Sequence, residues 1–171
     1  MKRSMKILEG RAHKLGDDIN TDLVISGRYK FAIQDIAELS KHIFEDIDPD
    51  FAKKIKRGAS FIVAGENFGM GSSREQAPLV IKESGINAVI ARSFARIFYR
   101  NAFNIGLLLV EADTDKIDDG DRLSFDLKKG QIIDKNKNVI INTNAIPSFM
   151  MKFIDAGGAL DYIKKYKEFS F

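Results

Sequence analysis

Apolar and polar positions recur along the chain in patterns that predict a mixed α/β protein. Alternating or continuous apolar segments predict short strands at residues 6–14, 23–25, 60–64, 87–91, 107–110, 121–127, 131–134 and 138–142. Apolar residues at helical spacing predict helices at residues 35–46, 49–56, 76–84, 93–104, 148–155 and 159–168. Capping residues agree with these bounds, because Asp35 and Ser93 stand at predicted helix starts and Gly106 follows a predicted helix end.

The order of these elements predicts the topology. Strand 60–64, helix 76–84 and strand 87–91 make a parallel βαβ crossover the expected arrangement. Beyond residue 113 the predicted strands are short and are separated by polar, glycine-containing hairpin turns. We therefore expect an α/β fold with a central, partly parallel sheet, flanking helices and a small β-hairpin region.

The composition is that of an ordinary globular domain. Of the 171 residues, 44% are hydrophobic and 30% are charged, and the net charge is +3. The cations are interspersed with acids, so no basic stripe predicts binding to nucleic acid. No apolar run approaches the roughly 20 residues that span a bilayer. Residues 1–6 carry charges but no apolar core of a signal peptide, so we expect a single cytoplasmic domain over residues 1–171.

The absence of cysteine excludes several kinds of chemistry. The chain has no cysteine, so it can form no disulfide, offer no thiolate and hold no cysteine-bound zinc or iron–sulfur cluster. Its two histidines, His13 and His42, lie on different predicted elements. We therefore expect no metal site in this chain and interpret both histidines as ordinary polar residues.

The glycine-rich segment 65–75 is the strongest candidate for a functional site. It follows a buried strand and brings two hydroxyls and a guanidinium, Ser72, Ser73 and Arg74, to the start of a helix. Free N–H groups at such a position favour an anion, and the glycines let the backbone approach a ligand. This composition predicts a site for a small carboxylate or phosphate. Because Pro78 lacks an N–H, residues 72–75 could form a tight turn before the regular helix.

A purely structural role for this segment is the alternative. Ser73 could be the N-cap of the following helix, since a single glycine-rich loop is weak evidence of function. The segment lacks the Gly-Lys-Ser/Thr ending of a phosphate-binding Walker loop. It also lacks the acidic residue after the next strand that a dinucleotide site requires.

Other polar and aromatic clusters have structural interpretations. The acidic turn 16–22 departs from the spacing of a calcium loop and is typical of a capped surface turn. Three arginines spaced by four, together with Asn101, predict a solvated helix face, which could instead line the anion site or a partner interface: Arg92, Arg96 and Arg100. Four nearby aromatic residues are interpreted as core: Phe94, Phe98, Tyr99 and Phe103.

Three motifs together resemble a known family. Residues 16–22 (GDDINTD), 65–76 (GENFGMGSSREQ) and 93–97 (SFARI) occur in the order and spacing of the small subunits of the aconitase superfamily. The resemblance covers nearly the whole chain. It implies a swivelling β/β/α domain of the aconitase C-terminal type that closes over the active site of a separate large subunit. That partner would carry a [4Fe–4S] cluster on three cysteines, in a heterodimer or heterotetramer.

The resemblance also assigns roles to individual residues. Ser72 matches the catalytic base, which removes a proton next to a substrate carboxylate. Ser73 and Arg74 match residues that bind this carboxylate, and Asp22 matches the acid that orients the site. A serine needs a dry, cationic environment to act as a base, which a closing domain would supply.

A further loop is expected to select the substrate. In the family this loop reads the variable end of a malate-type dicarboxylate, and its positions here are Tyr29, Lys30, Phe31 and Ala32. Homoaconitases place an arginine near Phe31, so the aromatic ring implies an apolar substituent, although Lys30 could also reach the pocket.

The resemblance therefore favours the isopropylmalate dehydratase branch, a hydro-lyase of leucine biosynthesis that interconverts 2- and 3-isopropylmalate. The 2,3-dimethylmalate dehydratase and homoaconitase branches are the enzymatic alternatives. A non-enzymatic anion-binding scaffold is a fourth, against which the presence of both Ser72 and Arg74 argues.

Overall fold

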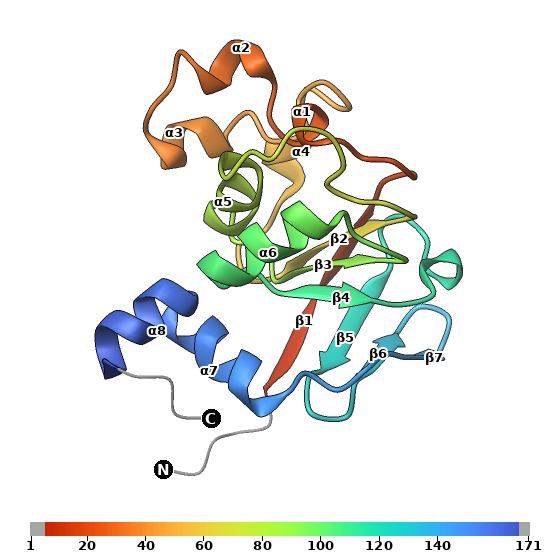
Figure 1. Cartoon of the computed structure of the whole chain (residues 1–171). Helices are drawn as coiled ribbons and strands as arrows, with labels where there is room; N and C mark the ends of the chain where they lie inside the picture. The colour runs from red at the N-terminus through yellow and green to blue at the C-terminus, as the bar shows by residue number, and fades with distance from the viewer. Residues whose placement is uncertain (1–5, 168–171) are drawn as a thin grey trace.

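The computed structural model describes residues 6–167. Its centre is one seven-stranded sheet with the order β4-β3-β2-β1-β5-β6-β7 (Figure 1). The strands are β1 (Ile7–Lys14), β2 (Ser60–Ala64), β3 (Ala88–Ala91), β4 (Leu109–Glu111), β5 (Arg122–Asp126), β6 (Gln131–Asp134) and β7 (Val139–Asn142). The expectations for residues 1–5 and for the end of the last helix at Glu168 lie outside the described residues.

One half of the sheet is parallel. β2 pairs with β1 on one side and with β3 on the other, and β3 pairs with β4, all in parallel. Helix α5 (Gln76–Glu83) connects β2 to β3, and α6 (Arg96–Ile105) connects β3 to β4. The predicted βαβ crossover is therefore confirmed.

The other half of the sheet is antiparallel. β1 pairs with β5, β5 with β6 and β6 with β7, so the hairpin region extends the parallel half across β1. The predicted partly parallel sheet with a hairpin region is confirmed. β1 is thus the strand that joins the two halves.

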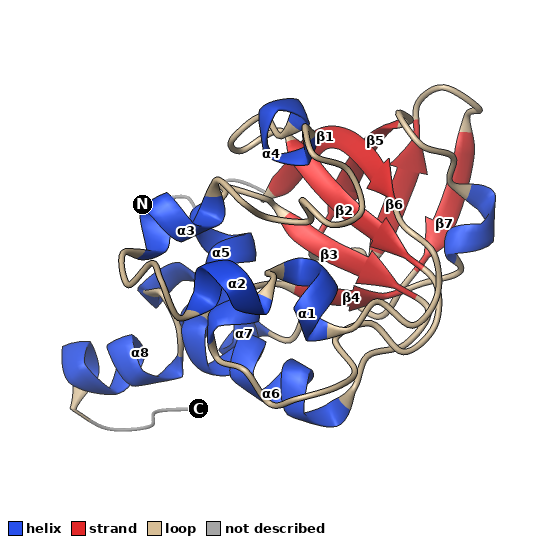
Figure 2. Cartoon of the chain, turned by 90° about the horizontal axis from the view of Figure 1, so that it is seen from above, coloured by secondary structure: helices blue, strands red, loops and turns tan. Residues whose placement is uncertain are grey.

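Two groups of buried side chains lie on opposite faces of the sheet. On one face, residues such as Ile62 and Val89 pack against Phe98 and other residues of the helices, which Figure 2 shows gathered on one side of the sheet. On the other face, Phe61 and Phe125 pack within the curled sheet. β2 and β3 are buried along their whole length because both of their faces are covered.

The segment between β1 and β2 departs most from the sequence-based prediction. Residues 23–25 do not form a strand, because α1 (Thr21–Val24) begins after Asn20, whose side chain accepts a hydrogen bond from the Leu23 amide. Part of the predicted loop at 29–34 is also helical, as α2 (Gly27–Lys30). A local cap outweighed the strand propensity of three apolar residues.

Several helices are shorter than their apolar pattern suggested. α3 (Ile36–Ser40) has the predicted cap Asp35 but ends early, and α4 covers only Phe51–Lys54. α6 begins at Arg96 and not at Ser93, because the Ser93 hydroxyl accepts from the Asn67 amide instead of capping the helix. The C-terminal helices are α7 (Ser148–Ala156) and α8 (Ala159–Tyr166).

Pro78 lies inside α5 but within its first turn, where its missing N–H leaves no intrahelical bond unmade. Within residues 6–167, no helix is long and apolar enough to cross a membrane.

Candidate functional site

The segment 65–75 leaves β2 and folds back over the carboxyl end of the parallel strands. Two isolated parallel bridges hold it, Asn20 to Met70 and Phe68 to Phe94. Gly69 has φ +84°, and a Cβ atom there would lie 2.2 Å from a ring atom of Phe98. The glycine therefore allows both the left-handed turn and the close packing on α6.

Ser72, Ser73 and Arg74 all line one hollow of about 340 Å³. Both serines are exposed, and neither hydroxyl forms a hydrogen bond to any residue in the range 6–167. The Thr21 hydroxyl donates to the Ser72 carbonyl at 3.0 Å, which fixes the backbone and leaves the side chain free. Because Glu75 precedes α5 and no side chain caps that helix, the alternative of Ser73 as an N-cap is wrong.

Arg74 joins the glycine segment to the acidic turn. Its Nη1 lies 2.5 Å from Oδ1 of Asp22, across 52 residues of sequence. The Arg74 side chain is 24% exposed and that of Asp22 is 59% exposed. The ion pair therefore holds one side of the guanidinium at the rim of the hollow.

A second arginine holds the base of the same two segments together. Arg92 donates to Asp17 at 3.2 Å and to Asp115 at 3.0 Å, and Asp17 also accepts from the Glu66 amide at 2.8 Å. The pKa of Asp17 is below its usual range, mainly because its carboxylate accepts the hydrogen bond from the Glu66 amide. The hydrogen bond and positive charge of Arg92 lower it further. A Cβ atom at Gly65 would lie 1.7 Å from Asp17 Oδ1, so only glycine admits this contact.

These contacts change the interpretation of the predicted arginine face. Arg92 lies just beyond β3 and organises the loops, whereas Arg96, in the first turn of α6, lines the hollow beside Ser72. Ile97 and Asn101 of α6 also line it; the sequence analysis grouped Asn101 with the polar face but did not include Ile97 in the site. Their closeness to Ser72 depends on how α6 packs under the glycine segment. In the sequence, only the SFARI motif indicates that this helix belongs to the site.

The predicted specificity loop, residues 29–32, begins in the last residues of α2 and continues into the turn after it. The Tyr29 hydroxyl donates to Glu45 at 2.8 Å, and its ring stacks on that of His42 at a centroid distance of 3.8 Å. His42 is thus packed against Tyr29, and its Nδ1 lies 2.5 Å from Oε2 of Glu45. Ala32 lies in the turn that follows α2.

Lys30 and Phe31 of this loop are placed differently. Phe31 is 82% exposed, and the ammonium of Lys30 lies 4.7 Å from the centre of its ring. Partial burial, followed by the positive charge of Arg74, lowers the pKa of Lys30, while Asp22 opposes this shift. The structure therefore brings Lys30 into the electrostatic surroundings of Arg74.

The described part of the chain offers no metal site. The sequence contains no cysteine, and residues 6–167 contain no group of three or more His, Asp or Glu side chains that could hold a metal ion. His13 lies on β1, where its Nε2 is 3.2 Å from the Ser60 hydroxyl. The aromatic residues of α6 are largely core, with Phe98 2% exposed.

The chain is similar to known proteins over most of its length. The model of the aconitase C-terminal domain family matches residues 23–115. The chain is 55% identical over 157 residues to 3-isopropylmalate dehydratase small subunit 2 of Archaeoglobus fulgidus, covering 92% of this chain and 94% of that one. It is 52% identical over 161 residues to the methanogen homoaconitase small subunit of Methanocaldococcus jannaschii, covering 94% of each.

A solved structure has the same fold. The crystal structure of 3-isopropylmalate dehydratase LeuD from Methanocaldococcus jannaschii superimposes with a TM-score of 0.89 at 51% identity, over 95% of this chain and 96% of that one. The chain belongs to the aconitase C-terminal domain family, as a relative of the small subunits of its dehydratases.

Proposed function

We propose that this chain is the small subunit of a 3-isopropylmalate dehydratase. It is a hydro-lyase that interconverts 2- and 3-isopropylmalate by dehydration and rehydration, as a step of leucine biosynthesis. Residues 1–171 act as one swivelling domain that closes over a large subunit in the cytoplasm. The similarity to several subunits of that name over more than nine-tenths of the chain supports this proposal.

The observation that carries the proposal is the convergence of two distant segments at one hollow. Ser72 and Ser73 expose unbonded hydroxyls there, and Asp22 holds Arg74 beside them. A carboxylate bound by Arg74 and Ser73 would place its neighbouring carbon close to the Ser72 oxygen. Removal of a proton from that carbon is the first step of a dehydration of this kind.

Ser72 is the base in this scheme and requires assistance. A free serine hydroxyl is far too weakly acidic to lose its proton near neutral pH. The guanidinium of Arg74 and the backbone N–H groups of the segment would stabilise the alkoxide and the charge developing on the carboxylate. This stabilisation is strongest when water is excluded, yet both serines are exposed in this chain alone. A second protein surface is needed to complete the site.

That second surface is the large subunit, in a heterodimer or heterotetramer. Its [4Fe–4S] cluster would supply a Lewis acid for the departing hydroxyl. This chain cannot hold the cluster, because it has no cysteine. Its own contribution is the base, the carboxylate-binding residues and the loop that contacts the substrate's variable end.

One observation favours a second candidate, the small subunit of a homoaconitase. Lys30 is a partly buried cation in the surroundings of Arg74 and could bind an additional carboxylate. The exposed ring of Phe31 argues instead for an apolar substituent, either isopropyl or the methyl group of 2,3-dimethylmalate. The substrate therefore depends on whether Lys30 or Phe31 contacts its variable group, which would be a carboxylate in the first case and an apolar substituent in the second.

The test is to reconstitute the chain with its large subunit and to measure kcat/KM on 3-isopropylmalate, 2,3-dimethylmalate and homoaconitate. The proposal expects the highest value for 3-isopropylmalate and no turnover by either subunit alone. Turnover by this chain free of its partner would contradict the division of the active site. Inactivity of the reconstituted pair on all three substrates would favour the anion-binding scaffold.

Two substitutions then separate the specificity residues. Phe31→Arg should lower kcat/KM for 3-isopropylmalate and raise it for the tricarboxylate, because an arginine can pair with the extra carboxylate. Lys30→Met should leave 3-isopropylmalate turnover within a fewfold of its original value. If neither variant changes the ratio of the two substrates, residues 29–32 do not form the specificity loop.

A further inference from the structure

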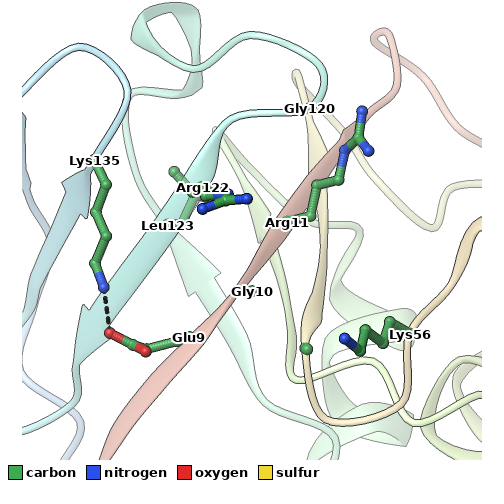
Figure 3. Close-up of a pocket in the computed structure, with 9 residues that line it drawn as sticks. Glu9, Gly10, Arg11, Lys56, Gly120, Arg122, Leu123 and Lys135 are labelled. Carbon is green, nitrogen blue, oxygen red and sulfur yellow. Dashed lines mark hydrogen bonds and ion pairs between the residues drawn. The ribbon is translucent and has the colours of Figure 1, made fainter.

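A second hollow, larger than the one at Ser72, lies on the outer face of β1 and β5. It measures about 660 Å³ and is bordered by Gly10 and Ala59, near the start of β2, whereas the segment 65–75 follows the end of that strand. Figure 3 shows its charged side chains, which come from β1, β5, the loop before β2 and the residue after β6. They are Glu9, Arg11, Lys56, Arg122 and Lys135.

The charges around this hollow are unbalanced. Four cations face one carboxylate, and that carboxylate, Glu9, already forms an ion pair with Lys135. The hydrogen bond from Lys135 is the main cause that lowers the pKa of Glu9. Over residues 6–167, Arg11, Lys56 and Arg122 form no ion pair with any carboxylate. Three cations therefore border one hollow without an ion-pair partner among the described residues.

Two of these cations are cross-strand neighbours. Arg11 of β1 pairs directly with Arg122 of β5, and both side chains are exposed on the outer face. The next residues, Ala12 and Leu123, point inward and are buried, which confirms the side on which the arginines lie. Like charges directly opposite each other destabilise an antiparallel pair. An anion held between them would convert this repulsion into attraction.

The backbone keeps the hollow open. Gly120 has φ +88°, and a Cβ atom there would lie 2.9 Å from Nη2 of Arg11. A Cβ atom at Gly10 would lie 2.6 Å from the carbonyl carbon of Ala59. In Figure 3, Arg11 extends toward Gly120, and Arg122 lies between β5 and β1. A side chain at either glycine would therefore intrude on the wall of the hollow.

We propose that this hollow binds a small multivalent oxyanion of the diphosphate or phosphate-ester class. Guanidinium groups bind phosphate oxygens through paired N–H donors, and Lys56 adds a point charge from the loop before β2. The volume falls in the range of about 300–1,000 Å³ that is usual for small-ligand sites. The site is separate from the proposed active site and does not depend on the dehydratase assignment.

The direct test is calorimetric titration of the full chain with pyrophosphate at constant ionic strength. Saturable binding is expected, and Arg11→Gln combined with Arg122→Gln should weaken it at least tenfold. The matched control is Lys128→Gln combined with Lys129→Gln, which removes two charges from the exposed β5–β6 turn of the same sheet. Equal weakening in the control would show diffuse attraction and overturn the proposal.

Two further measurements locate the site and test the repulsion. Arg74→Gln should leave pyrophosphate affinity unchanged, whereas loss of binding would place the anion at the Ser72 hollow and overturn the proposal. At low salt and without pyrophosphate, Arg122→Gln should raise the melting temperature, and it should do so less when Arg11 is already glutamine. Pyrophosphate should also raise the melting temperature of the native chain more than sodium chloride of equal ionic strength does. An equal rise with both salts would contradict the site.

Discussion

The two halves of the sheet use the same kind of hydrogen bond in opposite surroundings. At the carboxyl end of the parallel half, Asp17 accepts from the Glu66 amide and lies partly in water. In the antiparallel half, Asp134 accepts from the amides of Asn136 and Lys137 and has no exposed surface. Losing an acceptor costs more where water cannot replace it. The parallel half can therefore leave reactive groups accessible to water, while the buried Asp134 of the antiparallel half depends on its protein partners.

The same contrast separates the side chains that could react from those that stabilise. Ser72 and Ser73 are exposed and make no hydrogen bond within residues 6–167, so changing their side chains should cost little stability. Phe125, in the antiparallel half, is fully buried. The molecule thus places its candidate chemistry on loops held by a rigid sheet, as binding sites commonly are. The following substitutions test this separation.

The largest effect is expected for Ser72→Ala. Loss of the base should reduce kcat of the reconstituted enzyme by about 10²–10⁴-fold, while the free energy of unfolding of this chain changes by less than about 0.5 kcal/mol. Kinetics of the complex and urea denaturation of the isolated subunit measure the two quantities. Ser148→Ala, at an exposed serine of α7, is the control and should change neither. Full activity of Ser72→Ala would remove this residue from the mechanism.

The opposite behaviour is expected for Phe125→Ala. Its ring is fully buried in the face of the sheet that the helices α5 and α6 do not cover. Truncation should lower the free energy of unfolding by about 3–5 kcal/mol, because it removes apolar contacts and leaves a cavity. Denaturant melts measure this loss. The fraction that remains folded should retain its kcat with the partner, and a selective loss of kcat would show that the two halves are coupled.

Two hairpin aspartates give a matched pair for the cost of burial. Asp134→Ala removes a fully buried acceptor of two backbone amides and should cost about 1–3 kcal/mol of stability. Asp126 makes the same pair of bonds, to the amides of Lys128 and Lys129 at 3.0 Å each, but it is only half-buried. Asp126→Ala should cost less, about 0.5 kcal/mol, because water can replace the lost acceptor. Equal losses in urea melts would show that burial does not set the cost.

The smallest effect concerns acid stability. Burial would raise the pKa of Asp121, but hydrogen bonds from Lys137 and the Asp118 amide hold it below its ordinary value of 3.8. Because the folded pKa is lowered, this contribution to stability is present above about pH 4 and is lost as the pH falls through the folded value. Asp121→Asn should therefore flatten the decline in melting temperature below pH 4.

Lys137→Met should flatten the same part of the acid profile, since it removes the cation that lowers the Asp121 pKa. If both variants decline as steeply as the native chain, other carboxylates cause the acid sensitivity.

The positions of strands and helices could be predicted from the sequence where the local pattern and the tertiary environment favour the same structure. The strands β1, β2 and β3 were predicted within a residue at each end, because fully buried or alternating segments have few alternatives. Predictions failed where a polar side chain decided between two local structures. Asn20 capped a helix over residues 21–24 in place of a strand, and the Ser93 hydroxyl bonded to the Asn67 amide, so that α6 begins three residues later than predicted.

The chain's residue types by themselves determined the fold class, the lack of a cysteine-bound cofactor and the segment 65–75 as a candidate anion site. Only the tertiary structure placed Asp22 on Arg74, Arg92 on Asp17 and Asp115, and Arg11 opposite Arg122. These pairs lie between 23 and 111 residues apart in the sequence, so no local pattern encodes them. Periodicity reports which face of an element is buried, whereas contacts between charged groups depend on how the finished elements pack together.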